Sequence, residues 1–413
     1  MTATRTGRDL LALPGFRRWY AARMTSLVGT AASGVAVPML VWDRTGSATA
    51  TAAASGLALA PYLLFGLFAG AYADRLDRRR LMVGADAAAA VLLATVPLAA
   101  LFGTVTAVHV LAVVVLTGTA FVWFDAAAFG ALPQIVGPGG LQRANSLIFS
   151  TSTVVGIAAP ALGGLLASVA GPETVLGLNA FTFAASALLL RGLTLPERPA
   201  AKAASIGADI AEGLRFIWSE PRIRALTFAG FGIACTGGGA LGLIVVHAHE
   251  LLHVPDWKLG LLYSATAAGS LLGAMFLTRW TARFGHGPVS IAAYLTELAM
   301  VIALAAAGPG PAAFALAVAA WIAWDAAHTA AVVNGITVRQ LLTPDALQGR
   351  VNTTGRMIAW GGAPIGALAA GGLADLVGVR NAFLLLAIPV AAGAILLLAS
   401  PVRRLRTIAP PRS

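Results

Sequence analysis

Long runs of apolar residues alternate with short polar breaks along the whole chain. Each run holds about 20 residues, the length that a helix needs to cross the roughly 30 Å hydrocarbon core of a bilayer. The runs are Trp19–Trp42, Thr49–Tyr72, Leu81–Phe102, Ala107–Ile135, Asn145–Ala170, Val175–Leu193, Ala225–Val246, Leu259–Leu277, Val289–Ala307, Ala312–Val338, Gly355–Val377 and Asn381–Ser400. The pattern therefore predicts an all-α membrane protein with twelve transmembrane helices.

The composition indicates that lipid is the surrounding solvent. Charged residues make up 11% of the chain, against roughly a quarter in soluble domains. Hydrophobic residues make up 58%, and the mean hydropathy is +0.82. Twelve spans with short loops use up nearly all 413 residues, so we expect no sizeable soluble domain. The single cysteine, Cys235, excludes an intramolecular disulfide.

The net charge of +11 is distributed unevenly across the predicted spans. With the N-terminus inside, 25 of the 28 Lys and Arg residues fall on the inner side, and Arg44, Lys258 and Arg380 fall on the outer side. This asymmetry follows the positive-inside rule, so we expect cytoplasmic N- and C-termini in a cell inner membrane. It also argues against a nucleic-acid partner. No cleavable signal peptide is expected, because the first span is too long.

The chain is expected to have two halves, residues 1–193 and 222–413, joined by a cytoplasmic linker at 194–221. In the linker, Ile206, Ile210, Leu214 and Ile217 follow helical spacing, which predicts an amphipathic helix on the inner membrane face. The segments Leu141–Asn145 and Leu347–Asn352 echo one another ahead of the fifth and eleventh spans. A duplicated set of six spans is typical of transporters built from parallel repeats.

A charged loop separates the second and third spans, and it carries a resemblance. The stretch Gly70–Arg80 reads GAYADRLDRRR. Together with Thr45–Ala48, Glu212–Ile217, Ala363–Gly366 and further matches along nearly the whole chain, it resembles major facilitator superfamily transporters. Within that superfamily it resembles the proton-driven drug exporters that include macrolide and enterobactin exporters. This implies two pseudo-symmetric six-helix halves that give alternating access.

The resemblance implies a gating role for the loop. In such transporters an aspartate at the end of span 2 accepts hydrogen bonds from the N-terminus of span 11 in the outward-facing state. The corresponding residues here are Gly70, Asp74, Arg75, Arg78 and Gln134. Two positions depart from the pattern: Asp77 replaces a common glycine, and Gln134 replaces an acid that often pairs with the arginine. The alternative is a generic positively charged inner loop.

The fifth span carries Gly156, Pro160, Gly163 and Gly164. This spacing resembles the antiporter motif, in which small residues let helices approach closely and proline bends the helix. The alternative is ordinary glycine packing in a chain with 46 glycines.

Ionisable residues inside the apolar spans indicate chemistry, because a charge there costs at least about 2.5 kcal/mol. The four acids are Asp86, Asp125, Glu297 and Asp325. We expect Asp86 to pair with the Arg78–Arg80 cluster, and Glu297 to serve either as a packing carboxyl or as an auxiliary proton site.

Asp325 and His328 lie three residues apart, on one helix face. An acid and a histidine so placed can load and release a proton near neutral pH. Our hypothesis is that this pair, with Asp125 across the cavity, couples proton entry to substrate exit. The alternative is a hydrogen-bonded structural pair.

The substrate cavity is expected to contain Arg23, which would counterbalance Asp125 or bind an anionic group, and Thr30, where the family often has an acid. Aromatic residues on the fourth and tenth spans would stack against a bulky amphipathic ligand. They include Trp123, Phe124, Trp321 and Trp324. The alternative is that these rings pack against lipid or other helices.

His249-Glu250-x-x-His253 matches the sequence signature of zinc hydrolases, in which two histidines on one helix bind the metal. Pro255 follows at once, where such enzymes continue the helix. We therefore keep a membrane zinc hydrolase only as a remote alternative and expect no metal site and no cofactor.

No Gly-Lys-Ser/Thr phosphate loop is present, because the only lysines are Lys202 and Lys258. The sequence thus favours a monomeric secondary transporter, not an enzyme, that exports drug-like amphipathic molecules by proton antiport. A siderophore or metabolite exporter and a gradient-driven uptake carrier remain as alternatives.

Overall fold

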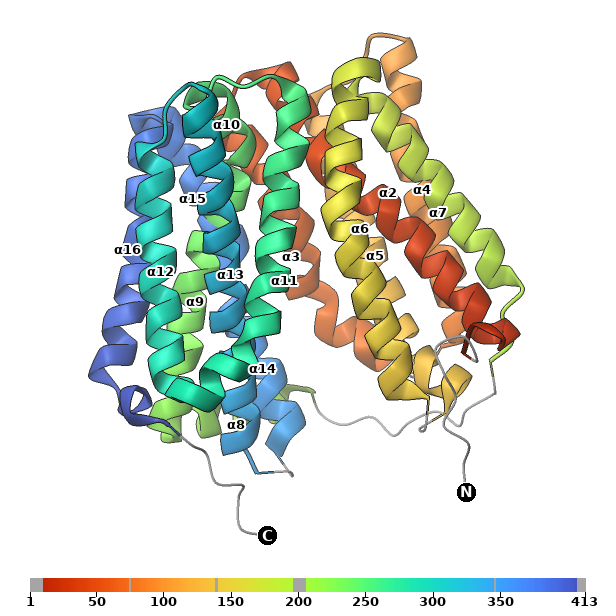
Figure 1. Ribbon diagram of the computed structural model, residues 1–413. Coiled ribbons are helices and arrows are strands. Elements are labelled where there is room, and N and C mark those ends of the chain that lie inside the picture. Colours follow the sequence, from red (N-terminus) through yellow and green to blue (C-terminus); the bar gives the residue numbers. More distant parts are fainter. Residues whose placement is uncertain (1–9, 74–75, 138–139, 196–205, 345–346, 407–413) are drawn as a thin grey trace. The chain divides into compact units, whose positions relative to one another are not determined.

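The protein is almost entirely helical in the computed structural model, which describes residues 10–73, 76–137, 140–195, 206–344 and 347–406 (Figure 1). Within these ranges, twelve helices are long and apolar enough to cross a bilayer. The predicted all-α fold with twelve transmembrane helices is therefore confirmed.

Residue contacts divide the chain into two compact units. Unit 1 contains Met1–Arg44, Leu57–Ala203 and Asp256–Gly260, and unit 2 contains Thr45–Gly56, Ala204–Pro255 and Leu261–Ser413. The division departs from the expected halves at two short segments, Thr45–Gly56 and Asp256–Gly260. Each segment makes its contacts mainly with the unit built from the other half of the chain.

Unit 1 is built from the helices of the first half. They are α2 (Pro14–Thr45), the later part of α3 (Ala48–Ala73), α4 (Arg78–Leu101), α5 (Ala107–Val136), α6 (Leu141–Ala170), α7 (Pro172–Arg191) and the short η1 (Asp256–Lys258). Helix α4 packs against α5 and α7, and α6 packs against α7 and η1. A core that includes Phe16, Trp19, Met82, Phe124 and Leu190 joins α2, α4, α5 and α7.

Polar caps mark the starts of α4 and α5 in unit 1. Asp77 caps α4, because its Oδ1 accepts from the Arg80 N–H at 3.1 Å. Thr106 caps α5 in the same way, accepting from the His109 N–H at 3.2 Å. Between α6 and α7, Gly171 has φ +85°, which a side chain rarely tolerates, and Pro172 opens α7. Short connections of this kind keep neighbouring spans antiparallel.

Unit 2 is built from the helices of the second half and the start of α3. They are α8 (Ile206–Ser219), α9 (Pro221–Gly242), α10 (Ile244–Glu250), α11 (Leu259–Phe284), α12 (His286–Ala306), α13 (Pro311–Leu342), α14 (Gln348–Trp360), α15 (Gly362–Val377), α16 (Val379–Ala399) and η3 (Pro401–Arg404). One hydrophobic core of this unit includes Leu226, Ile233, Tyr294, Val338 and Val390. These residues join α9, α12, α13 and α16, which pack against one another.

Helix α8 occupies the segment where an amphipathic helix was predicted, and it packs on α14. Gly213 permits the approach, since a Cβ there would lie 2.7 Å from the Arg350 carbonyl oxygen and from Thr354 Oγ1. Glu212 also forms an ion pair with Arg350. The opposite face of α8 exposes Leu214 and Trp218. That the exposed face rests on the membrane stays a prediction.

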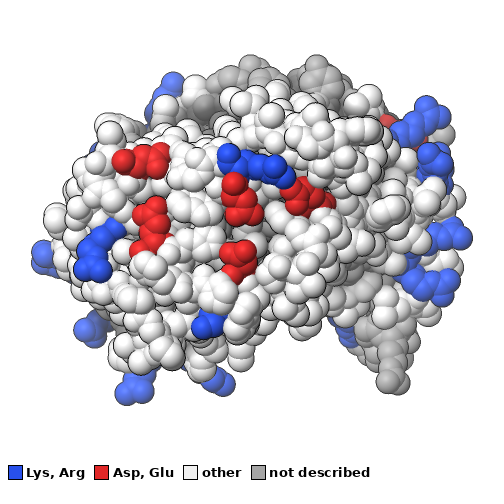
Figure 2. All heavy atoms as spheres, turned by 90° about the horizontal axis from the view of Figure 1, so that it is seen from above, with Lys and Arg blue, Asp and Glu red and all other residues white. Residues whose placement is uncertain are grey.

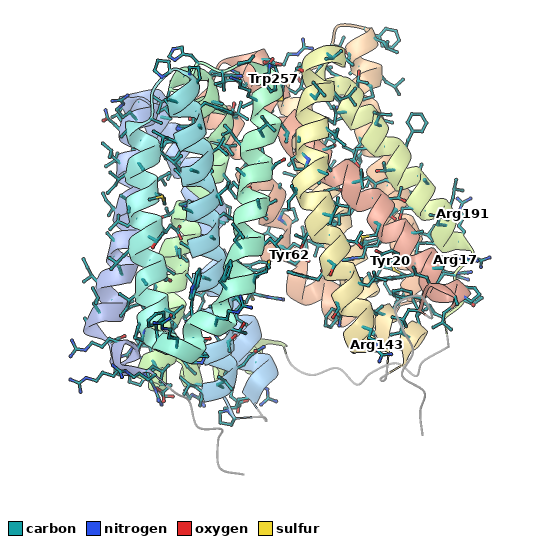
Figure 3. All side chains as sticks on the ribbon, viewed as in Figure 1. Arg17, Tyr20, Tyr62, Arg143, Arg191 and Trp257 are labelled. Atoms are coloured by element: carbon teal, nitrogen blue, oxygen red, sulfur yellow. The ribbon has the colours of Figure 1, made fainter. Side chains whose placement is uncertain are left out.

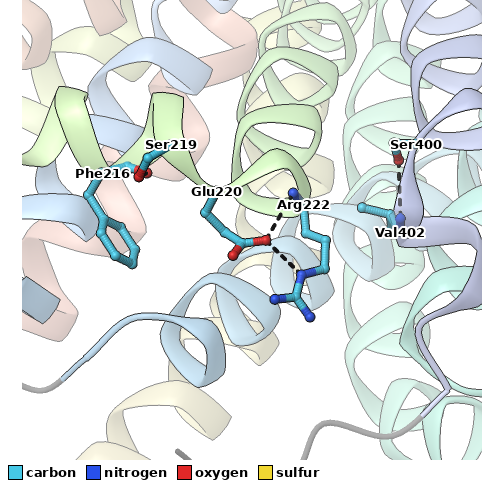
Figure 4. Close-up of polar contacts among 6 residues, drawn as sticks. All are labelled: Phe216, Ser219, Glu220, Arg222, Ser400 and Val402. Carbon is cyan, nitrogen blue, oxygen red and sulfur yellow. Dashed lines mark hydrogen bonds and ion pairs between the residues drawn. The ribbon is translucent and has the colours of Figure 1, made fainter.

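A carboxylate caps the start of α9 (Figure 4). Glu220 caps α9 by accepting from the Arg222 N–H at 3.3 Å and from Arg222 Nε at 2.7 Å. The hydrogen bond from the Arg222 side chain holds the pKa of Glu220 below its ordinary value. At the end of unit 2, Ser400 caps η3 by accepting from the Val402 N–H at 3.2 Å.

Candidate functional site: two polar clusters among the spans

The first polar cluster lies in unit 1 and joins three helices. Arg23 on α2 donates to Asp125 Oδ1 on α5 at 3.0 Å, and Tyr62 on α3 donates to Asp125 Oδ2 at 2.6 Å. The side chains of Arg23 and Asp125 are 27% and 31% exposed, so the pair is accessible and not sealed in the core. The guanidinium of Arg23 also lies 5.8 Å from the ring centre of Trp19. The expected pairing of Arg23 with Asp125 is present.

Tyr62 was not among the residues predicted from the sequence. Its ring lies 6.3 Å from that of Phe121 on α5, and Figure 3 labels it on α3. A tyrosine inside an apolar span is a usable signal, because its hydroxyl needs a partner once it leaves water. Tyr20 on α2 is a second case, since its hydroxyl lies 2.5 Å from Thr151 Oγ1 on α6.

Asp86 on α4 makes a contact that differs from the expected one. Its Oδ2 accepts from the Ser186 hydroxyl on α7 at 2.5 Å, and the residue is 1% exposed. The cation whose charge acts on it is Arg23, not the Arg78–Arg80 cluster. Asp86 therefore fastens α4 to α7 and extends the polar cluster of unit 1 into the core.

The second polar cluster lies in unit 2, on α12 and α13. His328 Nδ1 lies 3.4 Å from Glu297 Oε1 and 3.3 Å from Oε2. Glu297 is wholly buried, whereas 23% of the His328 side chain is exposed. Asp325 lies beside both residues and beside Ser270 of α11. The cluster thus joins the buried carboxyl group of Glu297 to the partly exposed side chain of His328.

Two neighbouring groups hold the ring of His328. The ring stacks on Trp324 with its centre 5.3 Å away and an interplanar angle of 26°. A Cβ at Gly237 of α9 would lie 2.7 Å from His328 Cε1, so only glycine leaves room for the imidazole. The histidine therefore has a defined orientation towards Glu297.

Three aromatic residues expected to line the cavity are packed in the core instead. Phe124 is 4% exposed, and Trp321 and Trp324 are 0% exposed. Trp321 contacts Trp324, His247 and Phe383, so its surface is taken up by other rings. The prediction that these three rings form stacking walls is therefore corrected. Trp123 is partly exposed and Thr30 is exposed, and their roles stay predictions.

In the gating loop, Asp74, Arg75 and the surroundings of Gly70 lie outside the described residues. Arg78 is 9% exposed and donates to the Gly130 carbonyl oxygen on α5 at 2.6 Å. Gly130 precedes Gln134 by one helical turn. Position 134 holds a glutamine and not an acid, and Arg78 donates to a backbone carbonyl of α5, the helix that carries Gln134. Asp77, the other departure from the family pattern, serves as the cap of α4.

The glycines of the fifth span lie at close helix contacts. A Cβ at Gly163 would lie 2.7 Å from the Ala32 Cα of α2, and a Cβ at Gly164 would lie 2.7 Å from the Gly260 nitrogen. Pro160 is buried inside α6, and Gly156 is partly exposed. The close packing expected of Gly163 and Gly164 is present, while an antiporter role for the motif stays a prediction.

The zinc-hydrolase alternative fails on geometry. Helix α10 ends at Glu250, and His253 has φ +49°, so His249 and His253 do not share one continuous helix. His247 is buried and its Nε2 lies 3.1 Å from the Leu304 carbonyl oxygen. Among the described residues, no three His, Cys, Asp or Glu side chains are grouped so that they could hold a metal ion.

The chain is similar to known transporters over nearly its whole length. Residues 10–411 match the family model described as "Transmembrane secretion effector". The multidrug efflux pump Tap of Mycolicibacterium fortuitum is 30% identical over 94% of both chains. Tap of Mycobacterium tuberculosis (strain ATCC 25618 / H37Rv) is 28% identical over 96% of both. The enterobactin exporter EntS of Escherichia coli O1:K1 / APEC is 25% identical over 87% of this chain and 85% of that one.

Solved structures support the fold. The nucleoside transporter NupG has a TM-score of 0.77 at 13% identity, covering 93% of this chain and 98% of that chain. A bacterial homologue of the iron transporter ferroportin, in an inward-facing state, has a TM-score of 0.76 at 15% identity, covering 94% and 98%. The chain belongs to the transmembrane secretion effector family of the major facilitator superfamily, and it is a membrane transporter, not an enzyme.

Proposed function

We propose that the protein exports amphipathic small molecules across the cytoplasmic membrane in exchange for protons, by alternating access. The support for export is the similarity to multidrug efflux pumps over 94% of the chain. The positive-inside charge distribution favours cytoplasmic termini. In unit 1, Arg17, Arg143 and Arg191 lie at one end and Trp257 at the other, in agreement with that orientation (Figure 3). One chain carries both six-helix repeats, so we expect a monomer to suffice.

The observation that carries proton coupling is the cluster of Glu297, His328 and Asp325. A carboxyl with 0% exposure inside a span is costly to keep charged, and such residues mark proton pathways in transporters. His328 Nδ1, at 3.3 Å, gives Glu297 a proton partner whose side chain is 23% exposed. On this proposal His328 and Asp325 exchange protons with water, and Glu297 stores the proton while substrate leaves.

Asp125 is the second proton site on this proposal. Its two oxygens are held by Arg23 and Tyr62. A proton on Asp125 would weaken the attraction of Arg23, and the guanidinium would then be free to bind an anionic substrate. Because a guanidinium binds carboxylates and other oxyanions well, this arrangement favours a second candidate substrate class, acidic siderophores. The similarity to an enterobactin exporter points the same way.

The test uses Glu297→Gln and Asp325→Asn in proteoliposomes. In each variant, pH-driven accumulation of ethidium should fall at least about tenfold below that of the unmodified protein, because the substitution removes a carboxyl group proposed to bind a proton. Each should keep counterflow, the exchange of labelled for unlabelled substrate without a gradient. Glu220→Gln, which alters a carboxyl outside the spans, is the matched control and should keep both activities. Full pH-driven accumulation in Glu297→Gln and Asp325→Asn would refute the assignment.

A further inference from the structure

The short helix η3, which follows α16, is fastened directly to the start of α12. The Gly287 N–H donates to the Leu405 carbonyl oxygen at 2.8 Å. A Cβ at Gly287 would clash with the Val402 carbonyl oxygen. Gly285, which has φ +90°, lies beside the other end of the turn, since a Cβ there would be 2.5 Å from Arg406 Cα. The two glycines therefore let the backbone of residues 402–406 rest against α12.

The packing of this turn decides which of its side chains are exposed. Val402 and Leu405 are buried and belong to the hydrophobic core that joins α9, α12, α13 and α16. They are three residues apart, so in a turn of three residues they lie on the same side. The intervening and following residues are Arg403, Arg404 and Arg406, and all three are exposed. Burial of the two apolar side chains thus directs three arginines away from the core.

The last turns of α11 add two more arginines at the same end of unit 2 (Figure 1). Arg279 and Arg283 are exposed and share a helix face, because they are four residues apart. Trp280 and Phe284 beside them are also exposed, and the Arg283 guanidinium lies 5.3 Å from the ring centre of Phe284. The glycine that contacts the backbone of Arg406 follows Phe284 directly. We call Arg279, Arg283, Arg403, Arg404 and Arg406 the basic corner.

Acidic side chains do not balance the basic corner. Residues 259–296 and 376–406 contain no Asp or Glu, and neither does α9, which packs against η3 together with α12 and α16. Glu220, the cap of α9, is engaged by Arg222 at 2.7 Å (Figure 4). Among the described residues, no carboxylate forms an ion pair with the basic corner. The opposite end, seen in Figure 2, shows Asp and Glu side chains beside Lys and Arg.

Exposed apolar side chains continue from the basic corner along the helices. Ile395 and Leu398 lie in the last two turns of α16 and are exposed, as is Trp280 on α11. A ligand that fits this surface carries negative charge at one end and apolar chains along its length. Guanidinium groups bind phosphate oxygens in pairs, and basic sites on the cytoplasmic side of membrane proteins attract anionic headgroups. A phospholipid with a net negative charge combines these properties.

We propose that the basic corner is a binding site for anionic phospholipids of the inner leaflet: the arginines bind the phosphate, and the acyl chains lie against α16. The site is independent of the proposed transport, and only its assignment to the inner leaflet rests on the proposed orientation. Each arginine near an anionic headgroup strengthens binding roughly fivefold. The triple variant Arg403→Gln, Arg404→Gln and Arg406→Gln should therefore bind such a lipid on the order of 100-fold more weakly.

The experiment titrates full-length protein in a neutral detergent with phosphatidylglycerol, with phosphatidylcholine of the same acyl chains and with inorganic phosphate. Native mass spectrometry counts the bound lipid, and thermal unfolding gives the midpoint with and without it. Phosphatidylglycerol should bind and raise the midpoint, whereas the other two ligands should not. The triple Arg→Gln variant should lose this response, and the same three positions changed to Lys, which keeps the charge, should lose less of it. The substituted side chains are exposed, so the midpoints without lipid should stay close to that of the unmodified protein.

The matched control changes Arg17, Arg143 and Arg191 to Gln, three arginines at the corresponding end of unit 1 (Figure 3). It removes the same net charge and should keep the binding of phosphatidylglycerol. An equal loss in this control would show a general effect of charge, and an equal rise in midpoint with inorganic phosphate would show a site for free anions. Either result, or unchanged lipid binding in the triple Arg→Gln variant, would overturn the proposal. Neither readout needs a proton gradient or transport, so failure here is distinguishable from failure of the proposed function.

Discussion

At the scale of single residues, the accessible ion pair of Arg23 and Asp125 is the feature most open to test. Arg23, Asp125 and Tyr62 come from three helices and satisfy one another, with both carboxylate oxygens engaged. Because the pair is only about 30% exposed, the loss of one member leaves the other without its partner in a partly dry site. The cluster thus contributes to stability as well as to the proposed chemistry.

We predict that Arg23→Ala and Asp125→Ala each destabilise the protein, and that the double variant is less unstable than the sum of the two. The non-additive part should be about 1 kcal/mol, as for a hydrogen bond to a charged group in a partly exposed site. The measurement is thermal unfolding of the purified protein in detergent. Additive effects within error would show that the two side chains do not interact.

The residue scale also shows what the sequence could and could not predict. Arg23, Asp125, Asp325 and His328 can be recognised because charge is rare in an apolar run. Tyr62 can be suspected for its hydroxyl, but its partner Asp125 cannot be predicted, because the pairing depends on how far α3 is rotated towards α5. The burial of Trp321 and Trp324 escapes prediction for the same reason, since spacing does not tell which face of α13 packs inside unit 2.

At the scale of helices, glycine positions decide how closely the spans approach. Gly163 on α6 leaves no room for a side chain against Ala32 of α2, whereas a Cβ at Gly34 on α2 would have no atom within 4 Å. The two glycines therefore form a matched pair for a test: Gly163 is needed for close helix packing, whereas Gly34 has room for a side chain.

We predict that Gly163→Ala lowers the thermal midpoint, because overpacking against backbone atoms costs about 1–3 kcal/mol. Gly34→Ala should leave the midpoint unchanged or raise it, since alanine is favoured over glycine in a helix by about 0.5–1 kcal/mol. Both midpoints are measured by thermal unfolding in detergent. A Gly163→Ala variant as stable as Gly34→Ala would contradict the close contact between α6 and α2.

Most helix boundaries follow from the apolar runs, and the exceptions occur at glycines. The run Ala107–Ile135 corresponds to α5, which spans Ala107–Val136. The predicted span Ala225–Val246 instead ends at Gly242 and is followed by α10, after a stretch that includes Gly237, Gly238 and Gly239. Likewise, Gly361 separates α14 from α15 within one predicted span. Glycine weakens the helix at these points, and the pattern of apolar residues alone does not predict these helix breaks.

At the scale of the whole molecule, the protein combines twelve candidate membrane spans with a cluster of Glu297, His328 and Asp325 in unit 2, which we propose binds protons. Duplicated six-helix repeats allow one side to open while the other closes. Family membership identifies the protein as a transporter, and the buried acids supply the reason to propose protons as the driving ion.

The most direct test of proton-driven export uses inverted membrane vesicles that contain the protein, with an acidic interior and no ATP. The panel holds one amphipathic cation (ethidium), one macrolide (erythromycin) and one catecholate siderophore (enterobactin). The account predicts that at least one compound accumulates in the vesicles and that its entry releases protons from them, with both effects lost in Glu297→Gln. Accumulation that requires ATP, or that persists when the pH gradient is collapsed, would contradict it.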